Sequence, residues 1–380
     1  MDTTFEVIVV GLGAMGSAAT YQLAKRGTRV LGIEMFQPGH DRGSSHGEHR
    51  MIRNSSFQAD GYVPLADRAF ALWRELEAEA NQRLLQTTGE IWLLHEDGNP
   101  GYRAGVQDSL ARGFRVILSD AELAEQFPGF RLHEGMIALY EADAGFIRSE
   151  AGIVSHVDQA RRRGAAIHLD EEVTAWATDG GGVRVETRRG TYRADRLVLA
   201  AGPWSEEVLP DLRLPMQVER RVNGFFRPAR PDLWALERGA PDFLLDVPEG
   251  SFYGMPAVGD IGVKIGLSAG EPTTARTIRR SIDEAEIELL RDVLDKYLPG
   301  ASGAELRRMT CMCTYTIDRD FVIDRHPAHP QVVVGCGFSG RGYKFAPVVG
   351  EILADLALEG ATRHDIDFLS ARRFAESVAA

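Results

Sequence analysis

A glycine-rich turn near the N-terminus constrains the fold more than any other feature of this chain. Gly11, Gly13 and Gly16 form a GxGxxG pattern that follows an apolar run at residues 5–10 and opens a helical pattern. In a βαβ unit such glycines permit a tight turn, let a pyrophosphate approach the backbone and let the helix lie close to the strand. The sequence therefore predicts a dinucleotide-binding fold, with contacts to the dinucleotide from Gly11, Gly13, Ala14, Met15 and Gly16.

The residue at the end of the second predicted strand limits which dinucleotide is bound. Glu34 follows the apolar segment 29–33, at the distance where an acid accepts hydrogen bonds from ribose hydroxyls. A carboxylate there repels a 2′-phosphate, which argues against NADP. NAD and FAD both remain possible from this motif alone.

Composition excludes several classes of function. A chain of 380 residues favours two domains, and no apolar run approaches the roughly 20 residues of a membrane helix. The first apolar strand starts too near Met1 for a signal peptide, so we expect a cytoplasmic protein. A net charge of −12 opposes binding to nucleic acid or anionic lipid. Three cysteines, Cys311, Cys313 and Cys336, are too few for a disulfide framework or a four-ligand zinc site, and we expect no metal.

Hydrophobic periodicity outlines the remaining elements. Helical patterns cover residues 14–27, 62–77, 151–163, 282–297 and 346–358. Short strands with Gly and Asp turns are expected between 167 and 201, in the region 210–268, and at 332–336. Residues 88–143 show a mixed pattern.

Four further segments separate FAD from NAD. They are the Gly-Ser loop 43–53, the strand and turn 194–205, the Cys-Met-Cys-Thr sequence 311–314, and the glycine-rich segment 337–345. Together with the N-terminal turn they resemble the monomeric sarcosine oxidase family, which includes N-methyltryptophan and pipecolate oxidases. The resemblance runs from residue 5 to about 374. It implies an α/β (α+β) fold, in which a Rossmann-like FAD-binding domain is interleaved with a mixed-sheet substrate domain.

The resemblance also implies domain boundaries. We expect the FAD-binding domain to comprise 1–87, 144–208 and 306–380, and the substrate-binding domain to comprise 88–143 and 209–305.

FAD in this family is attached through a cysteine sulfur, and Cys311 matches that cysteine by its place before Met312. The alternative is a small buried residue, which describes most cysteines. Cys313 would share a face with Cys311 if the segment is extended, and Cys336 is expected in the core. The resemblance places further FAD contacts at Ser44, Arg50, Val173, Gly202, Gly340, Gly342 and Lys344.

Catalytic roles follow from the same resemblance. Lys264 matches the lysine that promotes the reaction with oxygen, Arg50 matches an arginine at the flavin face, and His46 lies beside it in the loop. Tyr253 matches a pocket tyrosine. A solvated loop or strand charge is the ordinary alternative for the three basic residues, and a strand aromatic is the alternative for Tyr253.

Arg53 and Lys344 match the pair that receives the substrate carboxylate, the arginine as a bidentate fork and the lysine as a point charge. Three substrate-pocket positions depart from the family pattern. Cys313 replaces a tyrosine, while Arg341 and Ser268 replace histidines. Smaller residues at 313 and 268 leave room for a substrate larger than sarcosine, and Arg341 is available to a second acidic group.

The expected function is an FAD-dependent oxidase of secondary amines such as N-methyl or cyclic amino acids. It converts a C–N bond to an imine and reduces oxygen to hydrogen peroxide. Two alternatives remain: a flavin amine dehydrogenase with a non-oxygen acceptor, and a tailoring flavoenzyme of secondary metabolism. The expected partners are a small amine or amino acid and molecular oxygen, and the protein is expected to be a monomer.

Overall fold

The predicted βαβ unit is present at the start of the chain. The structure, a computed structural model, describes residues 4–54, 61–96 and 100–374. Strand β1 (Thr4–Val10) leads into helix α1 (Ala14–Lys25), and β2 (Val30–Ile33) returns parallel to β1. The helix ends two residues earlier than its pattern predicts, because Gly27 adopts a φ of +80°, in the left-handed region that ends helices.

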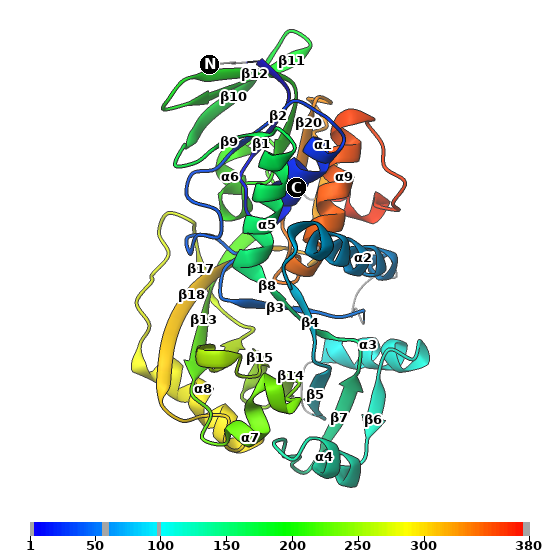
Figure 1. Ribbon diagram of the computed structural model, residues 1–380, viewed down its shortest axis with the longest axis vertical. Helices are drawn as coiled ribbons and strands as arrows, with labels where there is room; N and C mark the ends of the chain where they lie inside the picture. Colours follow the sequence, from blue (N-terminus) through cyan, green and yellow to red (C-terminus); the bar gives the residue numbers. More distant parts are fainter. Residues whose placement is uncertain (1–3, 55–60, 97–99, 375–380) are drawn as a thin grey trace.

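An eight-stranded sheet extends this unit (Figure 1). Strand β12 (Thr191–Leu199) pairs parallel to β1, and the path runs β10 (Val173–Asp179), β11 (Gly182–Thr187), β12, β1, β2, β9 (Ala166–His168). Strand β20 (Val332–Cys336) pairs with β12, and β19 (Val322–Arg325) pairs with β20. The first half of β12 belongs to the antiparallel meander and its apolar second half to the parallel sheet, so the strand starts earlier than the apolar pattern at 197 predicts.

Helices cover one face of this sheet. Helix α1 packs against α5 (Ser149–Arg162) and α9 (Ala346–Leu358), and α2 (Tyr62–Ala80) packs on α9 and α5. The buried faces of these helices form one core with β1 and β20. In that core the indole Nε1 of Trp73 donates to the carbonyl of Lys344 at 2.8 Å, so α2 also supports the turn before α9.

A nine-stranded sheet forms the other half of the molecule, in the lower part of Figure 1. Strand β18 (Glu305–Thr316) pairs antiparallel with the long β13 (Met216–Phe226) over most of its length. The path of the sheet is β17 (Glu271–Thr273), β13 (Met216–Phe226), β16 (Val263–Leu267), β15 (Gly250–Met255), β14 (Asp242–Val247), β5 (Glu90–His95), β7 (Met136–Glu141), β6 (Val116–Leu118). The helices of this half are α3 (Pro100–Ala111), α4 (Asp120–Gln126), α7 (Pro231–Trp234) and α8 (Glu284–Tyr297).

A small sheet joins the two halves. Its strands are β3 (His49–Ile52), β8 (Gly145–Arg148) and β4 (Leu85–Thr87), and Figure 1 places them between the larger sheets. The last part of the Gly-Ser segment 43–53 forms strand β3 and therefore lies in this small sheet.

The mixed α/β class and the interleaving of the chain are confirmed by these pairings. The domain boundaries themselves stay a prediction. Strand β18 belongs to the nine-stranded sheet, although the sequence assigns residues from 306 onward to the FAD-binding domain.

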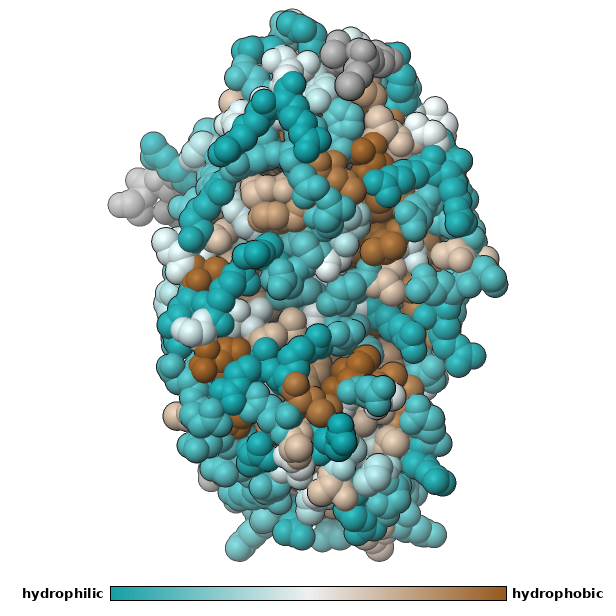
Figure 2. Space-filling view, turned by 60° about the vertical axis from the view of Figure 1, so that its left-hand side comes forward, coloured by the Kyte–Doolittle hydropathy of each residue, from teal (hydrophilic) through white to brown (hydrophobic). Residues whose placement is uncertain are grey.

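Surface hydropathy gives no large apolar area on the face in view. Figure 2 shows hydrophobic residues in small groups separated by hydrophilic ones. Among the described residues, no helix has both the length and the apolar character needed to cross a bilayer.

Candidate active site

One large cavity of about 680 Å³ lies between the glycine turn and the nine-stranded sheet. Most predicted site residues line it: Gly11, Gly13, Ala14, Met15, Glu34, Ser44, Arg50, Arg53, Val173, Gly202, Tyr253, Ser268, Cys311, Cys313, Gly340, Arg341, Gly342 and Lys344. Three predicted residues do not line the cavity themselves: Gly16, His46 and Lys264. The cavity thus connects the predicted dinucleotide and substrate groups in one space.

The glycine turn has the shape that a dinucleotide requires. A Cβ on Gly16 would lie 1.7 Å from the carbonyl oxygen of Gly11, so only glycine lets α1 begin there. Gly11 has a φ of +85°, and a Cβ added to it would lie 2.6 Å from the carbonyl oxygen of Ala200. At Gly13 the nearest atom to an added Cβ is the Ser45 hydroxyl at 3.8 Å, which leaves the open side of the turn for a pyrophosphate.

Glu34 lies at the adenosine end of the cavity. Its Oε2 accepts from the backbone N–H of Leu12 at 2.7 Å and its Oε1 from that of Phe36 at 3.0 Å. These bonds fix the carboxylate beside the turn, where its remaining lone pairs can accept from ribose hydroxyls. Val173 begins β10 and lines the same end. The residues present therefore fit the dinucleotide predicted from the sequence.

Lys264, on β16 of the nine-stranded sheet, forms hydrogen bonds with the loop before β3 and with the start of β3. This lysine is fully buried, and its Nζ donates to the carbonyls of Gly47 at 2.8 Å and His49 at 3.0 Å. Burial, helped by the positive charge of Arg50, lowers the pKa of Lys264 to about 7. Lys264 therefore faces inward and is not a solvated strand charge, and its charge changes near neutral pH.

Arg50 and His46 belong to that loop. The guanidinium of Arg50 donates to the carbonyls of His49 and Ser44, both at 3.1 Å, and lines the cavity. His46 Nε2 lies 3.1 Å from the carbonyl of Thr310, and its buried Nδ1 has no hydrogen-bond partner among the described residues. Burial, and then the charge of Arg50, lower the pKa of His46 to about 3, so its ring is neutral.

Cys311 and Cys313 lie on the same face of β18, as their spacing predicts for an extended segment. A hydrogen bond from the Cys313 thiol, with the charges of Arg50 and Lys264, holds the pKa of Cys311 below its usual range despite burial. A thiolate is the nucleophilic form of cysteine, so Cys311 has the environment of a reactive residue. Cys336 is buried in the core, as expected, and burial raises its pKa to about 12.

Arg53 and Lys344 lie next to each other in the cavity wall. Arg53 Nη1 pairs with Oε2 of Glu90 at 2.9 Å, and Lys344 Nζ donates to the carbonyl of Arg53 at 3.0 Å. Glu90 also pairs with the buried Arg115 at 2.7 Å. Burial and the neighbouring Arg53 lower the pKa of Lys344 to about 7. The predicted carboxylate pair is brought together, and a buried ion-pair network orients its arginine.

Three other predicted site residues, one catalytic and two substrate-binding, also line the cavity. The Tyr253 hydroxyl donates to Asn223 Oδ1 at 2.8 Å, and burial raises the Tyr253 pKa so that the phenol stays neutral. Ser268 directly follows β16 and lines the cavity. Arg341 is engaged by its own chain, since it donates to the carbonyl of Arg319 and pairs with Asp320 at 3.4 Å.

Arg221 and Tyr315 were missed by sequence reasoning, yet both line the cavity. Arg221 lies directly opposite Cys311 in the pairing of β13 with β18, so the two side chains share a face. Side chains alternate along β13, so one of the consecutive residues Arg220 and Arg221 must face inward. Only the register of the strand pairing shows which one it is.

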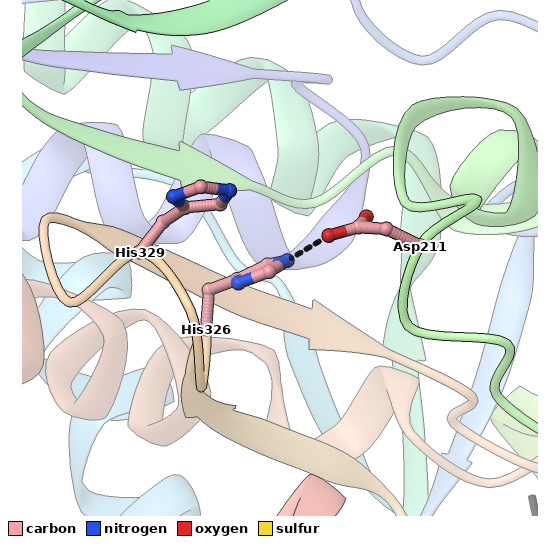
Figure 3. A group of neighbouring side chains, drawn as sticks. All are labelled: Asp211, His326 and His329. Carbon is pink, nitrogen blue, oxygen red and sulfur yellow. Dashed lines mark ion pairs between the residues drawn. The ribbon is translucent and has the colours of Figure 1, made fainter.

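A second group of side chains lies outside the cavity wall. Figure 3 shows the His326 ring directed toward Asp211, with His329 beside it. His326 Nε2 lies 3.0 Å from Asp211 Oδ2, and the two imidazole centroids are 4.7 Å apart. Nδ1 of His326 accepts from the N–H of Ala328 at 3.3 Å, so the neutral ring carries its proton on Nε2, toward the carboxylate. The group ties two loops together; the absence of a metal stays a prediction.

Known proteins share both the sequence and the fold. The FAD dependent oxidoreductase family matches residues 6–356. A monomeric sarcosine oxidase from Streptomyces avermitilis is 39% identical, with 100% of both chains covered. An N-methyl-L-tryptophan oxidase from Salmonella arizonae is 35% identical over 98% of this chain and 100% of its own. The solved structure of NikD, an unusual amino acid oxidase essential for nikkomycin biosynthesis, has a TM-score of 0.86 at 27% identity, covering 97% of this chain and 98% of that one. The chain therefore belongs to the FAD dependent oxidoreductase family, in its group of monomeric sarcosine and N-methyltryptophan oxidases.

Proposed function

We propose that this FAD-dependent enzyme oxidises secondary amines of amino acids, N-methyl or cyclic, with oxygen as the acceptor. The observation that carries the proposal is the cavity that joins the dinucleotide turn to the partly buried Arg53 and the buried Lys344. Relatives with 35–39% identity are named for oxidising sarcosine and N-methyl-L-tryptophan. Bound FAD would supply the acceptor for the two electrons and two protons that the amine loses when it becomes an imine, and oxygen would take them up as hydrogen peroxide. Water hydrolyses the imine.

The chain supplies binding and charge. Arg53 is oriented by Glu90 and offers donors to the substrate carboxylate, while Lys344 adds a second positive charge beside it. A bound carboxylate favours the ammonium form of Lys344, whose pKa is held near 7 by burial and by Arg53. The pair therefore selects amines that carry a carboxylate.

Neither His46 nor Tyr253 is suited to act as a base for the amine. His46 is neutral with a pKa of about 3, and burial keeps the Tyr253 phenol protonated. Desolvation and the nearby cations lower the pKa of the amine itself, so the substrate binds in its reactive neutral form. Cys311 is the proposed attachment point of FAD, supported by its lowered pKa and its place on the cavity wall. The proposed state is a monomer, as in the name of the first relative, and the cytoplasmic location stays a prediction.

The test is a screen of sarcosine, N-methyl and cyclic amino acids with two readouts. Anaerobic bleaching of the flavin measures oxidation of the amine, and peroxide release measures the oxygen reaction. We expect both with at least one substrate. Bleaching without peroxide, reversed by an artificial electron acceptor, would assign the chain as a dehydrogenase instead. Failure of every simple amino acid to bleach the flavin would favour a tailoring enzyme with a larger substrate.

A further inference from the structure

The charges lining the cavity are unevenly distributed. Its carboxylates are Glu34, Glu171, Glu172 and Glu207, all on segments around the eight-stranded sheet. The substrate end is lined by Arg50, Arg53, Arg221, Arg319, Arg341 and Lys344 without a lining carboxylate among the described residues. One substrate carboxylate accounts for Arg53 and Lys344. Of the rest, Arg50 is assigned to the flavin face and Arg341 pairs with Asp320 at 3.4 Å. Arg221 and Arg319 have no ligand assigned to them.

Arg221 is the best-placed residue of this set. It is 3% exposed, and its strand pairing puts it opposite Cys311 with Glu219 opposite Cys313. Its electrostatic neighbours include the side chains of Tyr315, Cys313 and Tyr253, which all line the cavity. A buried arginine within the wall is costly unless its donors are used.

Half of the Arg221 fork is already used, which holds the side chain in place. Nη2 donates to Glu219 at 2.7 Å and to the Tyr315 hydroxyl at 2.5 Å. Two guanidinium carbons lie near the centre of the Tyr315 ring, that of Arg221 at 5.1 Å and that of Arg319 at 4.2 Å. The buried Nη1 of Arg221 has no hydrogen-bond partner in the part of the chain that the structure describes. Arg221 is thus a fixed donor with one unused position.

The wall beside Arg221 is built from small residues. The neighbouring wall positions carry the small residues Cys313 and Ser268. A Cβ on Gly270, two residues after Ser268, would lie 3.2 Å from Cδ of Arg221, so this glycine borders the arginine stem. A substrate group that enters this space meets Arg221.

We propose that Arg221 forms a second anion subsite, and that the preferred substrate is a secondary amino acid with an acidic side chain. Oxidation of such a substrate rests on the proposed function, whereas its binding at Arg221 does not. The first carboxylate occupies Arg53 and Lys344, and the second accepts from Nη1 of Arg221. Because a hydrogen bond between charged groups is among the strong ones, the second carboxylate improves binding at least tenfold over a neutral amide of the same shape.

Calorimetric titration of the holoenzyme tests the subsite without turnover. The probes are succinate, glutarate and adipate, each compared with its monoamide, so that the spacing of the two carboxylates need not be assumed. We expect at least one diacid to bind ten times more tightly than its monoamide. In Arg221→Met that preference should fall below tenfold. In Arg220→Met it should persist, because Arg220 faces away and pairs with Glu286 at 2.6 Å. If Arg221→Met does not fold, Arg221→Gln is judged by the same threshold.

Two results would overturn the inference: a preference below tenfold for every diacid in the wild type, or a tenfold preference that survives the change at Arg221. Turnover distinguishes this failure from failure of the proposed function. Peroxide from neutral N-methyl amino acids without diacid preference removes only the subsite. Diacid preference that depends on Arg221, with no amine oxidised, removes only the proposed reaction. If both the subsite and the proposed oxidation are correct, kcat/KM for N-methyl-L-glutamate should exceed kcat/KM for N-methyl-L-glutamine. Arg221→Met should then reduce the ratio of these two values about tenfold.

Discussion

Replacing Lys264 with methionine should separate the reaction with oxygen from the reaction with the amine. The first electron transfer to oxygen creates an anion in a pocket with little water, and a fixed ammonium stabilises that anion. Lys264 is fully buried and is held by the carbonyls of Gly47 and His49. Removing one preorganised charge of this kind slows a reaction by about a hundredfold. Reoxidation of the flavin should therefore slow by that factor, while its anaerobic reduction by the amine persists.

The pKa of Lys264 gives this prediction a pH dependence. Burial lowers the value to about 7, so the side chain is charged below that pH and neutral above it. The charged fraction is about nine tenths at pH 6 and about one tenth at pH 8. Reoxidation in the wild type should fall roughly ninefold over that interval, and the rate in Lys264→Met should stay flat.

Stopped-flow measurement of both half-reactions is the assay. Lys264→Arg keeps the charge and should recover part of the rate, whereas Lys264→Gln keeps a donor without the charge and should not. Lys296→Met is the matched control, because Lys296 is on the surface and pairs with Glu249. The reasoning is refuted if both half-reactions of Lys264→Met stay within about twofold of the wild type, as surface substitutions do. Equal losses in both would indicate a general defect of the pocket.

Three further predictions concern the binding of FAD and the binding of the substrate carboxylate by Arg53. Acid-precipitated wild type should stay yellow and Cys311→Ser should release its FAD into the supernatant; a colourless wild-type pellet would exclude the attachment. Arg53→Met should raise the KM for the amino acid at least tenfold, from a lost charged hydrogen bond of about 1.5–3 kcal/mol, with little effect on amines without a carboxylate; an unchanged reductive half-reaction would remove Arg53 from the site. Gly16→Ala should prevent folding or FAD binding because its Cβ would overlap the Gly11 carbonyl, whereas Gly13→Ala should fold and only weaken FAD binding; similar FAD affinity in both, measured by fluorescence titration, would contradict this.

Local signals predicted the parts of the fold that depend on neighbouring residues. The βαβ unit was readable because its strand, turn and helix occupy one continuous stretch, residues 4–33. The shared face of Cys311 and Cys313 needed only the period of two in an extended strand. Both features are set by short-range geometry, and both are present in the structure.

Long-range pairing was beyond the same reasoning. The mixed segment 88–143 could not be assigned, because β5 is completed by a parallel partner, β14, about 150 residues later in the chain. The ion pair between Arg53 and Glu90 likewise joins elements with no sequence relation. Arg221 was overlooked because its inward orientation depends on the register of β13 against β18.

The position of Cys311 on β18 has a consequence for how the holoenzyme responds to dilution. The glycine turn that receives the dinucleotide belongs to the eight-stranded sheet, and β18 belongs to the nine-stranded sheet. A noncovalent cofactor stabilises a protein by a free energy that grows with the logarithm of the free cofactor concentration, and it is lost when the solution is diluted. A cofactor attached at Cys311 stays with the unfolded chain, and its adenosine end meets the glycine turn at an effective concentration on the order of millimolar. Refolding would then proceed equally well with or without added FAD, at any protein concentration.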